Sequence, residues 1–166
     1  KAIEAFIEVA RVNPQTIELH FALGSLFRRR GEVERAIRMH QDLAEREDLA
    51  QEQKLQALLE LAQDYLKAGL LDRAEELFLK LEGTTHSEAA LRFLLEIYEQ
   101  EKDWHKAIGI AEKLEALSGR SYQKEIANFC CEMAARALMQ SRPAEARPHL
   151  DAALVHHRTC VRANML

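Results

Sequence analysis

The sequence predicts an all-α fold built from a repeated pair of antiparallel helices. Of its 166 residues, 48% are hydrophobic and 30% are charged, whereas 6 are glycine and 3 are proline. Leu, Ala, Glu, Arg and Gln are abundant, and these residues favour helices. An all-β domain would need more turn residues and more aromatic side chains than the 6% found here. A small residue also recurs along the chain, at Ala2, Ala36, Ala74, Ala107 and Ala146.

The recurring alanine has the period of a tetratricopeptide repeat, a helix–turn–helix unit of about 34 residues. The stretch from Ala2 to Pro14 matches the second helix of such a unit, with a small residue, then an aromatic one, an apolar one and a closing proline. We predict one domain over 1–166, a solenoid in which antiparallel helix pairs form a right-handed superhelix. Its predicted parts are the second helix of an incomplete repeat at 1–14, repeats at 15–50, 51–84, 85–117 and 118–158, and the start of a further repeat at 159–166.

Each predicted repeat has a second close-contact position, which lies in its first helix, twelve residues before the alanine. Gly24, Ala62, Leu95 and Ala134 occupy it, and the small members let two helices approach closely. Residues at helical spacing predict the core seams around these positions. On the first helices they are Leu23, Phe27, Leu61, Tyr65, Leu94, Tyr98, Met133 and Ala137, and on the second helices His40, Leu43, Phe78, Leu81, Ala111, Leu114, Leu150 and Ala153.

Turn residues agree with this register. Gly31 and Gly69 lie five residues before the alanine, where a helix ends and a left-handed backbone is least costly for glycine; Lys102 has this place in the third repeat. Pro143 fits a first helical turn, whereas Pro148 predicts either a kink or a later helix start. The predicted helix starts are capping boxes at Asp48 with Gln51, Asp72 with Glu75 and Thr85 with Glu88, and simple N-caps at Asp103 and Ser141.

Charge and composition argue against several partners and compartments. A net charge of −4 gives no general attraction to nucleic acid or anionic lipid. No run approaches the roughly 18 apolar residues of a membrane span, so we expect no membrane insertion by this segment. Cys130 and Cys131 are adjacent and form no CxxC pair, so we expect them to pack in the core of a protein from a reducing compartment. Because the chain begins without Met and both ends interrupt a repeat, we expect it to be a piece of a longer protein.

Sequence motifs for catalysis or metal binding are lacking. The histidines have no metal-ligand spacing, and His156 and His157 point about 100° apart on a helix, so they do not chelate one ion easily. NFCCEMAARAL around the adjacent cysteines contains no base that would activate a thiol. Glycine-rich phosphate loops and hydrolase motifs are also missing from the sequence. We therefore predict no enzyme, no catalytic residues, no metal site and no cofactor in this segment.

A candidate binding surface comes from the first helices, which line the groove of a solenoid of this type. The run RRRGEVERAIR at 28–38 is the strongest local charge feature. The predicted groove residues are Glu18, Phe21, Ser25, Arg28, Arg29, Gln56, Leu59, Gln63, Lys67, Arg92, Glu96, Glu99 and Gln100. Arginine forks would bind carboxylates of a protein segment, while Phe21 and an exposed leucine would supply apolar area. An ordinary solvated helix surface explains the same residues equally well.

The groove hypothesis predicts the effect of a charge reversal, and it has an alternative. Glutamate at both Arg28 and Arg29 should weaken partner binding and leave the melting temperature nearly unchanged, because groove charges contribute little to the fold. An RNA-binding helical repeat is an alternative, but the net negative charge and low aromatic content oppose it.

Four segments carry a family resemblance: LGSLFRRRGEVERAIRMHQDL at 23–43, LAQDYLKAGLLDRAEELFLKL at 61–81, LLEIYEQEKDWHKAIGIAEKL at 94–114 and EIANFCCEMA at 125–134. They resemble the cytoplasmic repeat domain of the bacterial lipopolysaccharide assembly protein B family. The resemblance implies an adaptor on the cytoplasmic face of the inner membrane, which helps the FtsH protease degrade the deacetylase that commits material to lipid A. The implied partners are that protease, that deacetylase and inner-membrane lipopolysaccharide regulators, with no nucleic acid.

The resemblance also implies features beyond this segment. Members of the family have an N-terminal transmembrane helix and a C-terminal rubredoxin-like module, in which two CxxC pairs bind iron or zinc. Cys130 and Cys131 lack that spacing, so no metal ligand is transferred to them. The open solenoid ends would allow a homo-oligomer. A peptide-binding tetratricopeptide module of another bacterial assembly complex is the alternative function.

Overall fold

The computed structural model describes residues 4–5 and 17–166, and within this part it is helical and contains no strand. The predicted all-α fold is thus confirmed, whereas the helix expected at 1–14 lies outside the described residues except for Glu4 and Ala5. The helices are α2 (Ile17–Arg29), α3 (Val33–Glu45), α4 (Gln51–Lys67), α5 (Leu71–Lys80), α6 (Ser87–Glu101), α7 (Trp104–Ser118), α8 (Gln123–Met139), α9 (Pro143–His156) and α10 (Val161–Met165).

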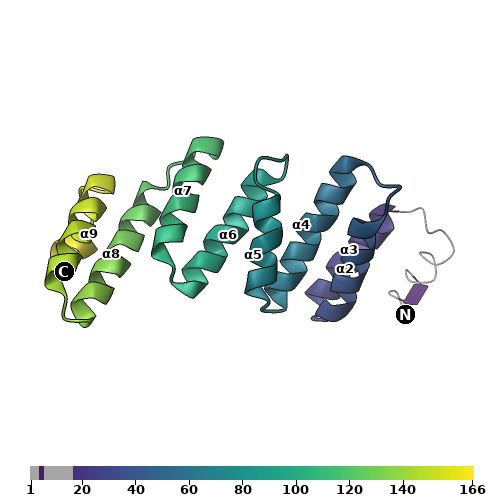
Figure 1. Ribbon diagram of the computed structural model, residues 1–166, viewed down its shortest axis with the longest axis horizontal. Coiled ribbons are helices and arrows are strands. Elements are labelled where there is room, and N and C mark those ends of the chain that lie inside the picture. Colours follow the sequence, from purple (N-terminus) through teal and green to yellow (C-terminus); the bar gives the residue numbers. More distant parts are fainter. Residues whose placement is uncertain (1–3, 6–16) are drawn as a thin grey trace. The chain divides into compact units, whose positions relative to one another are not determined.

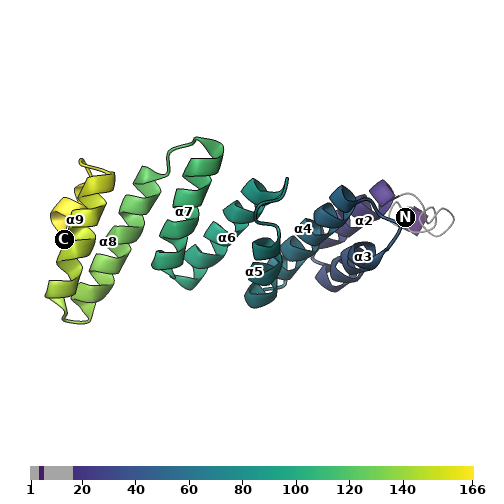
Figure 2. The same cartoon turned by 45° about the horizontal axis from the view of Figure 1, so that its top comes forward.

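The chain divides into two compact units, residues 1–90 and 91–166, whose boundary falls in the first turn of α6. In the first unit α2 packs on α3, both contact α4, and α4 packs on α5 (Figure 1). In the second unit α7 packs on α8 and α8 on α9 (Figure 2), and the short α10 contacts both α8 and α9. The repeat limits stay a prediction, since helix bounds do not decide where one repeat ends and the next begins.

The predicted close-contact positions are buried. Ala36, Ala74, Ala107 and Ala146 expose at most 1% of their surface. Their counterparts on the first helices, Gly24, Ala62, Leu95 and Ala134, are buried as well. A larger side chain at such a crossing would have to displace its neighbours, because helix interfaces are packed as densely as crystals. The burial predicted for the register alanines is therefore confirmed at these four positions, whereas Ala2 lies outside the described residues.

Four turns within the two units end their first helix in the same way. The left-handed residue is Gly31, Gly69, Lys102 or Ser141, with φ between 56° and 82°. The next residue in each turn donates its N–H to the carbonyl of Phe27, Tyr65, Tyr98 or Ala137 at 2.9 Å, the long bond of a Schellman motif. Ser141 was predicted as an N-cap, and this prediction is wrong because its backbone closes the preceding helix.

The predicted helix starts are mostly wrong by one or two residues. Asp103 is confirmed, since its side chain accepts a hydrogen bond from the Lys106 N–H. Asp72, however, lies inside the first turn of α5, whose N-cap is Leu70. There its carboxylate still faces the positive end of the helix dipole.

The other two predicted capping boxes fail for related reasons. Asp48 precedes the true N-cap of α4, Ala50, whose N–H donates to the Gln53 side chain, and Asp48 instead pairs with Arg46. Thr85 lies two residues before α6 and donates its hydroxyl to the Glu52 carboxylate. In both places the side chain that was expected to cap the helix pairs with another side chain instead.

Helix α9 contains both prolines of the last predicted repeat. Pro143 is its first residue, as predicted, because the first helical turn needs no proline N–H. Pro148 lies inside the helix, so the alternative of a later helix start is wrong. Pro148 cannot donate the helical hydrogen bond to the carbonyl of Ala144.

A cation–π contact recurs at one position of the register. In three helix pairs, the basic residue directly before the register alanine lies over an aromatic ring of the first helix. The contacts are Arg35 over Phe27 at 4.2 Å, Arg73 over Tyr65 at 5.7 Å and Lys106 over Tyr98 at 5.0 Å. At the same positions α8 and α9 carry Ala137 and Glu145, which cannot make this contact. The recurrence ties the two helices of each pair at the turn end.

Candidate functional site

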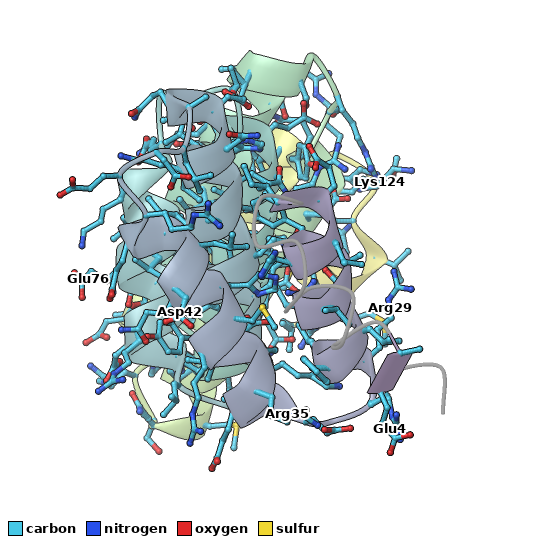
Figure 3. All side chains as sticks on the ribbon, turned by 90° about the vertical axis from the view of Figure 1, so that its right-hand side faces the viewer. Glu4, Arg29, Arg35, Asp42, Glu76 and Lys124 are labelled. Carbon is cyan, nitrogen blue, oxygen red and sulfur yellow. The ribbon has the colours of Figure 1, made fainter. Side chains whose placement is uncertain are left out.

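The predicted groove residues of the first unit come from α2 and α4, which contact each other. Glu18, Arg29 and Lys67 are exposed, and Figure 3 shows Arg29 projecting outward from α2. Phe21, Ser25, Arg28, Gln56 and Gln63 are half-buried, and Leu59 is buried. The residues therefore differ in what a partner could reach.

Arg28 is held by two carboxylates of α4. Its guanidinium donates to Asp64 Oδ1 at 2.8 Å, to Glu60 Oε2 at 2.7 Å and to the Glu60 carbonyl at 3.1 Å. Burial alone would lower the pKa of Arg28, but the hydrogen bonds to Glu60 and Asp64 outweigh burial and raise it. The expectation that Arg28 contributes little to the fold is wrong, because this fork already links α2 to α4.

Polar side chains extend the Arg28 contact along the same two helices. Ser25 Oγ lies 3.4 Å from Glu60 Oε2, and Gln56 Nε2 donates to Glu60 Oε1 at 2.9 Å. Three predicted groove residues, Ser25, Arg28 and Gln56, thus converge on Glu60. They order each other within the chain, and their role in binding a partner stays a prediction.

A buried hydrogen bond between a histidine and a carboxylate lies beneath this network. His40 Nδ1 of α3 is 2.5 Å from Asp64 Oδ2, and both side chains are completely buried. Asp64 therefore uses one oxygen for Arg28 and the other for His40, which satisfies both of its buried oxygens. Among the described residues, His40 Nε2 is a buried nitrogen with no hydrogen-bond partner.

Gly24 makes room for this histidine. A Cβ placed on Gly24 would come within 2.3 to 2.9 Å of three ring atoms of His40, so even alanine would clash. The buried network was missed at the sequence level, although two signals pointed to it. His40 was assigned to an otherwise apolar seam, and Asp64 takes a register place that holds Leu26 and Ile97 in neighbouring repeats.

Apolar groove residues are less accessible than predicted. Leu59 exposes 7% of its surface, so the expected exposed leucine is wrong. Phe21 packs against the cluster of Leu43, Leu49 and Ala57, and its ring centroid is 6.2 Å from that of His40. An amphipathic helix presents its apolar side chains to the core before it presents them to a partner. The reachable part of this surface is therefore mainly polar.

The predicted residues of the second unit lie on α6. All four are exposed, namely Arg92, Glu96, Glu99 and Gln100. Partial burial of its carboxyl, together with the charges of Glu125 and Glu96, raises the pKa of Glu99. The α6 surface and the neighbouring α8 residue Glu125 thus form an acidic surface, in contrast to the mixed charges of the first unit.

A cleft of about 380 Å³ opens in the second unit at the α6–α7 turn, and it was not predicted. Trp104 lies in its wall and stacks on Phe129, with ring centroids 5.6 Å apart and an interplanar angle of 16°. Arg136, also in the wall, donates to the Lys102 carbonyl at 2.8 Å. Acidic and basic side chains both line the cleft, so its wall does not have a single sign of charge.

The described residues contain no group of three His, Cys, Asp or Glu side chains placed to hold a metal ion. His156 Nδ1 lies 2.8 Å from Gln123 Oε1, so its polar contact is with an amide side chain. Burial raises the pKa of the Cys130 thiol and, with the neighbouring Cys160, that of Cys131 to about 11. Both cysteines of α8 are buried, as predicted. None of the described helices combines the length and the apolar composition that a membrane crossing requires.

Comparison with known proteins agrees with this architecture. The tetratricopeptide repeat model matches residues 19–53, which include α2, α3 and the start of α4. Over 135 residues the chain is 46% identical to lipopolysaccharide assembly protein B of Escherichia coli strain K12, covering 81% of the chain and 35% of the relative. It is a tetratricopeptide-repeat homologue of that protein. The lipopolysaccharide assembly protein B of Haemophilus influenzae is 39% identical over 175 aligned residues, covering all of the chain and 44% of the relative.

The chain thus spans less than half the length of these curated relatives. Solved tetratricopeptide structures confirm the fold at low identity. The C-terminal part of a repeat protein from Cytophaga hutchinsonii has a TM-score of 0.63 at 19% identity, over 99% of this chain and 65% of that one. YrrB, described as a tetratricopeptide protein with an unusual peptide-binding site, has a TM-score of 0.56 at 14% identity, over 98% and 97%.

Proposed function

We propose that this chain is a non-catalytic adaptor that regulates lipopolysaccharide biosynthesis by bringing the lipid A pathway deacetylase to the FtsH protease. The observation that carries the proposal is the 39 to 46% identity to lipopolysaccharide assembly protein B over most of the chain. The repeat fold supports a protein partner, since tetratricopeptide solenoids offer extended surfaces for binding. The whole protein would act at the cytoplasmic face of the inner membrane, as the family resemblance implies.

The surface of α2 and α4 supports the choice of binding face. Arg28 and Glu60 fix the two helices relative to each other, so the exposed Arg29, Glu18 and Lys67 are displayed from an ordered base. A surface that is ordered before binding loses less conformational entropy when a partner arrives. Arg29 and Lys67 would bind acidic side chains of the partner, and Glu18 would fix its direction.

Catalysis and metal binding would lie elsewhere. The raised pKa values of Cys130 and Cys131 keep these thiols protonated near neutral pH, which is the opposite of an activated nucleophile. Iron or zinc in the whole protein would be held by residues other than those described. The chain would therefore act through binding alone.

Binding of the purified chain to the deacetylase and to FtsH tests the proposal. Arg29→Glu should weaken binding roughly tenfold, because it places like charges across the contact. The control is Arg38→Glu, which reverses another exposed arginine on α3, the second helix of the same pair. Isothermal titration or surface plasmon resonance measures both, and circular dichroism verifies that each variant is folded.

The outcomes separate the two parts of the proposal. Equal loss of affinity in both variants would mean that net charge, not the α2 surface, governs binding. Failure of the parent chain to bind either protein would remove the adaptor role from this segment. In a degradation assay that combines the deacetylase and FtsH, we expect the parent chain to accelerate loss of the deacetylase. We expect no such acceleration from Arg29→Glu.

A further inference from the structure

The second unit brings together two cysteines that are distant in sequence. Cys131 belongs to α8, and Cys160 is the residue directly before α10. Their Sγ atoms lie 3.8 Å apart, which is van der Waals contact between two sulfur atoms. All three cysteines of the chain are free thiols. Adjacent helical residues point about 100° apart, so Cys130 faces a different direction from Cys131.

We propose that Cys131 and Cys160 are a thiol modification site, at which a disulfide oxidant such as oxidised glutathione forms an intramolecular disulfide. Closing the bond needs an approach of the sulfur atoms to about 2.05 Å. Cys160 lies in the short connection between α9 and α10, where a side-chain rotation and a small backbone shift bring its sulfur closer. Cys131 is anchored in α8 and need not move.

The two thiols have different access to a reagent. Cys160 is half-buried, whereas Cys131 is completely buried. Burial, together with the neighbouring Cys160, raises the pKa of Cys131 to about 11. Because the thiolate is the attacking species, Cys160 is the thiol that meets the oxidant and Cys131 is the one that resolves the intermediate.

The chemistry balances without a further reactant. The Cys160 thiolate attacks one sulfur of oxidised glutathione, which forms a mixed disulfide and releases one glutathione thiolate. The released glutathione thiolate takes the proton of Cys131. The Cys131 thiolate then attacks Cys160 Sγ, which breaks the mixed disulfide and releases the second glutathione as a thiolate that is protonated by solvent. The two cysteines lose two electrons in total, and one oxidised glutathione is reduced to two molecules of glutathione.

The disulfide would fasten α10 to α8. At present Arg162 of α10 makes polar contacts with α8, to Glu132 at 2.5 Å and to Asn128 at 3.0 Å. Both residues that it contacts are on the α8 surface, whereas the sulfur contact lies beneath. A covalent bond there would close a loop of 29 positions and reduce the entropy of the unfolded chain. Oxidation should therefore raise the melting temperature and protect the amides of α10.

Thiol mapping of the purified chain tests the proposal. The chain is incubated with oxidised glutathione, remaining thiols are alkylated, and the protein is digested without reduction. We expect a peptide pair joined through Cys131 and Cys160, one alkylated cysteine at Cys130, and complete reversal by dithiothreitol. Hydrogen exchange of residues 161–165 should slow in the oxidised protein.

Matched variants make each step visible. Cys130→Ser should leave the cross-link intact, and Cys160→Ser should abolish it. Cys131→Ala should stop the reaction at a mixed disulfide of glutathione with Cys160, which intact mass spectrometry resolves. The proposal is overturned if the parent chain keeps all three thiols, retains the mixed disulfide, joins Cys130 to Cys160, or forms only intermolecular dimers.

Discussion

The seam that joins α2, α3 and α4 in the first unit contains buried polar side chains, whereas the seam of α8 and α9 in the second unit contains alanines and a leucine. His40 follows its register alanine by four residues and pairs with Asp64, while Leu150 has the equivalent place in α9 and packs on Ala134, Ala137 and Ala146. The first helix in contact carries glycine in one case, Gly24, and alanine in the other. Equivalent positions of the repeat therefore contain a polar side chain opposite glycine in one unit and an apolar side chain opposite alanine in the other.

The difference teaches how the residue at the crossing depends on its partner. A leucine side chain opposite alanine fills the space by apolar contact alone. The His40 ring comes closer to the facing helix, so only glycine fits there, and its nitrogen needs the buried carboxylate. Gly24, His40 and Asp64 thus form a set in which no member can be replaced singly without loss.

Removal of Asp64 should have the largest effect on this comparison. Asp64→Ala leaves His40 without its partner and removes one carboxylate from Arg28, so we expect a loss of about 3 kcal/mol in the free energy of unfolding. Urea denaturation measures it. Asp42→Ala, on the exposed surface of α3 (Figure 3), is the control and should change stability by less than about 0.5 kcal/mol. Similar losses in both variants would contradict the importance of the buried pair.

An alanine at Gly24 should have the next largest effect. Its methyl group would overlap the His40 ring, and we expect Gly24→Ala to destabilise the chain by about 2 kcal/mol. Gly109→Ala is the control, because that glycine lies inside α7 with open space around it, and alanine there should stabilise by up to about 1 kcal/mol. Thermal denaturation that shows the same sign for both glycines would refute the close approach of His40.

The cation–π contact should give a smaller effect that again differs between the regions. A double-mutant cycle of Arg35→Ala and Phe27→Leu should give a coupling energy of about 0.5 to 1 kcal/mol. Ala137 and Glu145 take the same positions in α8 and α9 and make no such contact, so Glu145→Ala is the control and should change stability by less than about 0.5 kcal/mol. A coupling energy near zero for Arg35 and Phe27 would mean that the stacked guanidinium adds nothing beyond its contact with Glu32.

The smallest effect on stability should come from Arg29. Arg29→Glu changes an exposed residue and should alter the melting temperature little, whereas Arg28→Glu places a third carboxylate beside Glu60 and Asp64 and should destabilise clearly. Differential scanning fluorimetry compares the two neighbours directly. Equal stability of these variants would contradict a stabilising role for the hydrogen bonds of Arg28 with Glu60 and Asp64.

The register of the helices could be predicted from sequence, because close packing leaves a visible trace. Ala36 and Ala74 are buried at helix crossings, and a residue of that size must recur wherever two helices meet closely. The turn positions of Gly31 and Gly69 were equally predictable, since a left-handed backbone favours glycine. Patterns that depend on one position and on local sterics are thus readable without a structure.

The polar network could not be predicted in the same way. Whether Arg28 faces solvent or two carboxylates depends on the rotation of α4 against α2, which residue spacing does not specify. The helix starts failed for a similar reason, because Asp48 and Thr85 each had a competing partner in the folded chain. The cysteine contact joins α8 to the segment that follows α9, 29 positions along the chain, so it becomes visible only in the folded structure.

The Schellman turns have a consequence for engineering. Lys102 and Ser141 adopt the left-handed backbone that Gly31 and Gly69 adopt, so the architecture of the repeat imposes this geometry even on side chains that resist it. Glycine at 102 and 141 would relieve that resistance while keeping the same hydrogen bonds. A version of this solenoid made more heat-resistant for crystallisation or partner screening would therefore begin with these two positions, whose side chains are exposed.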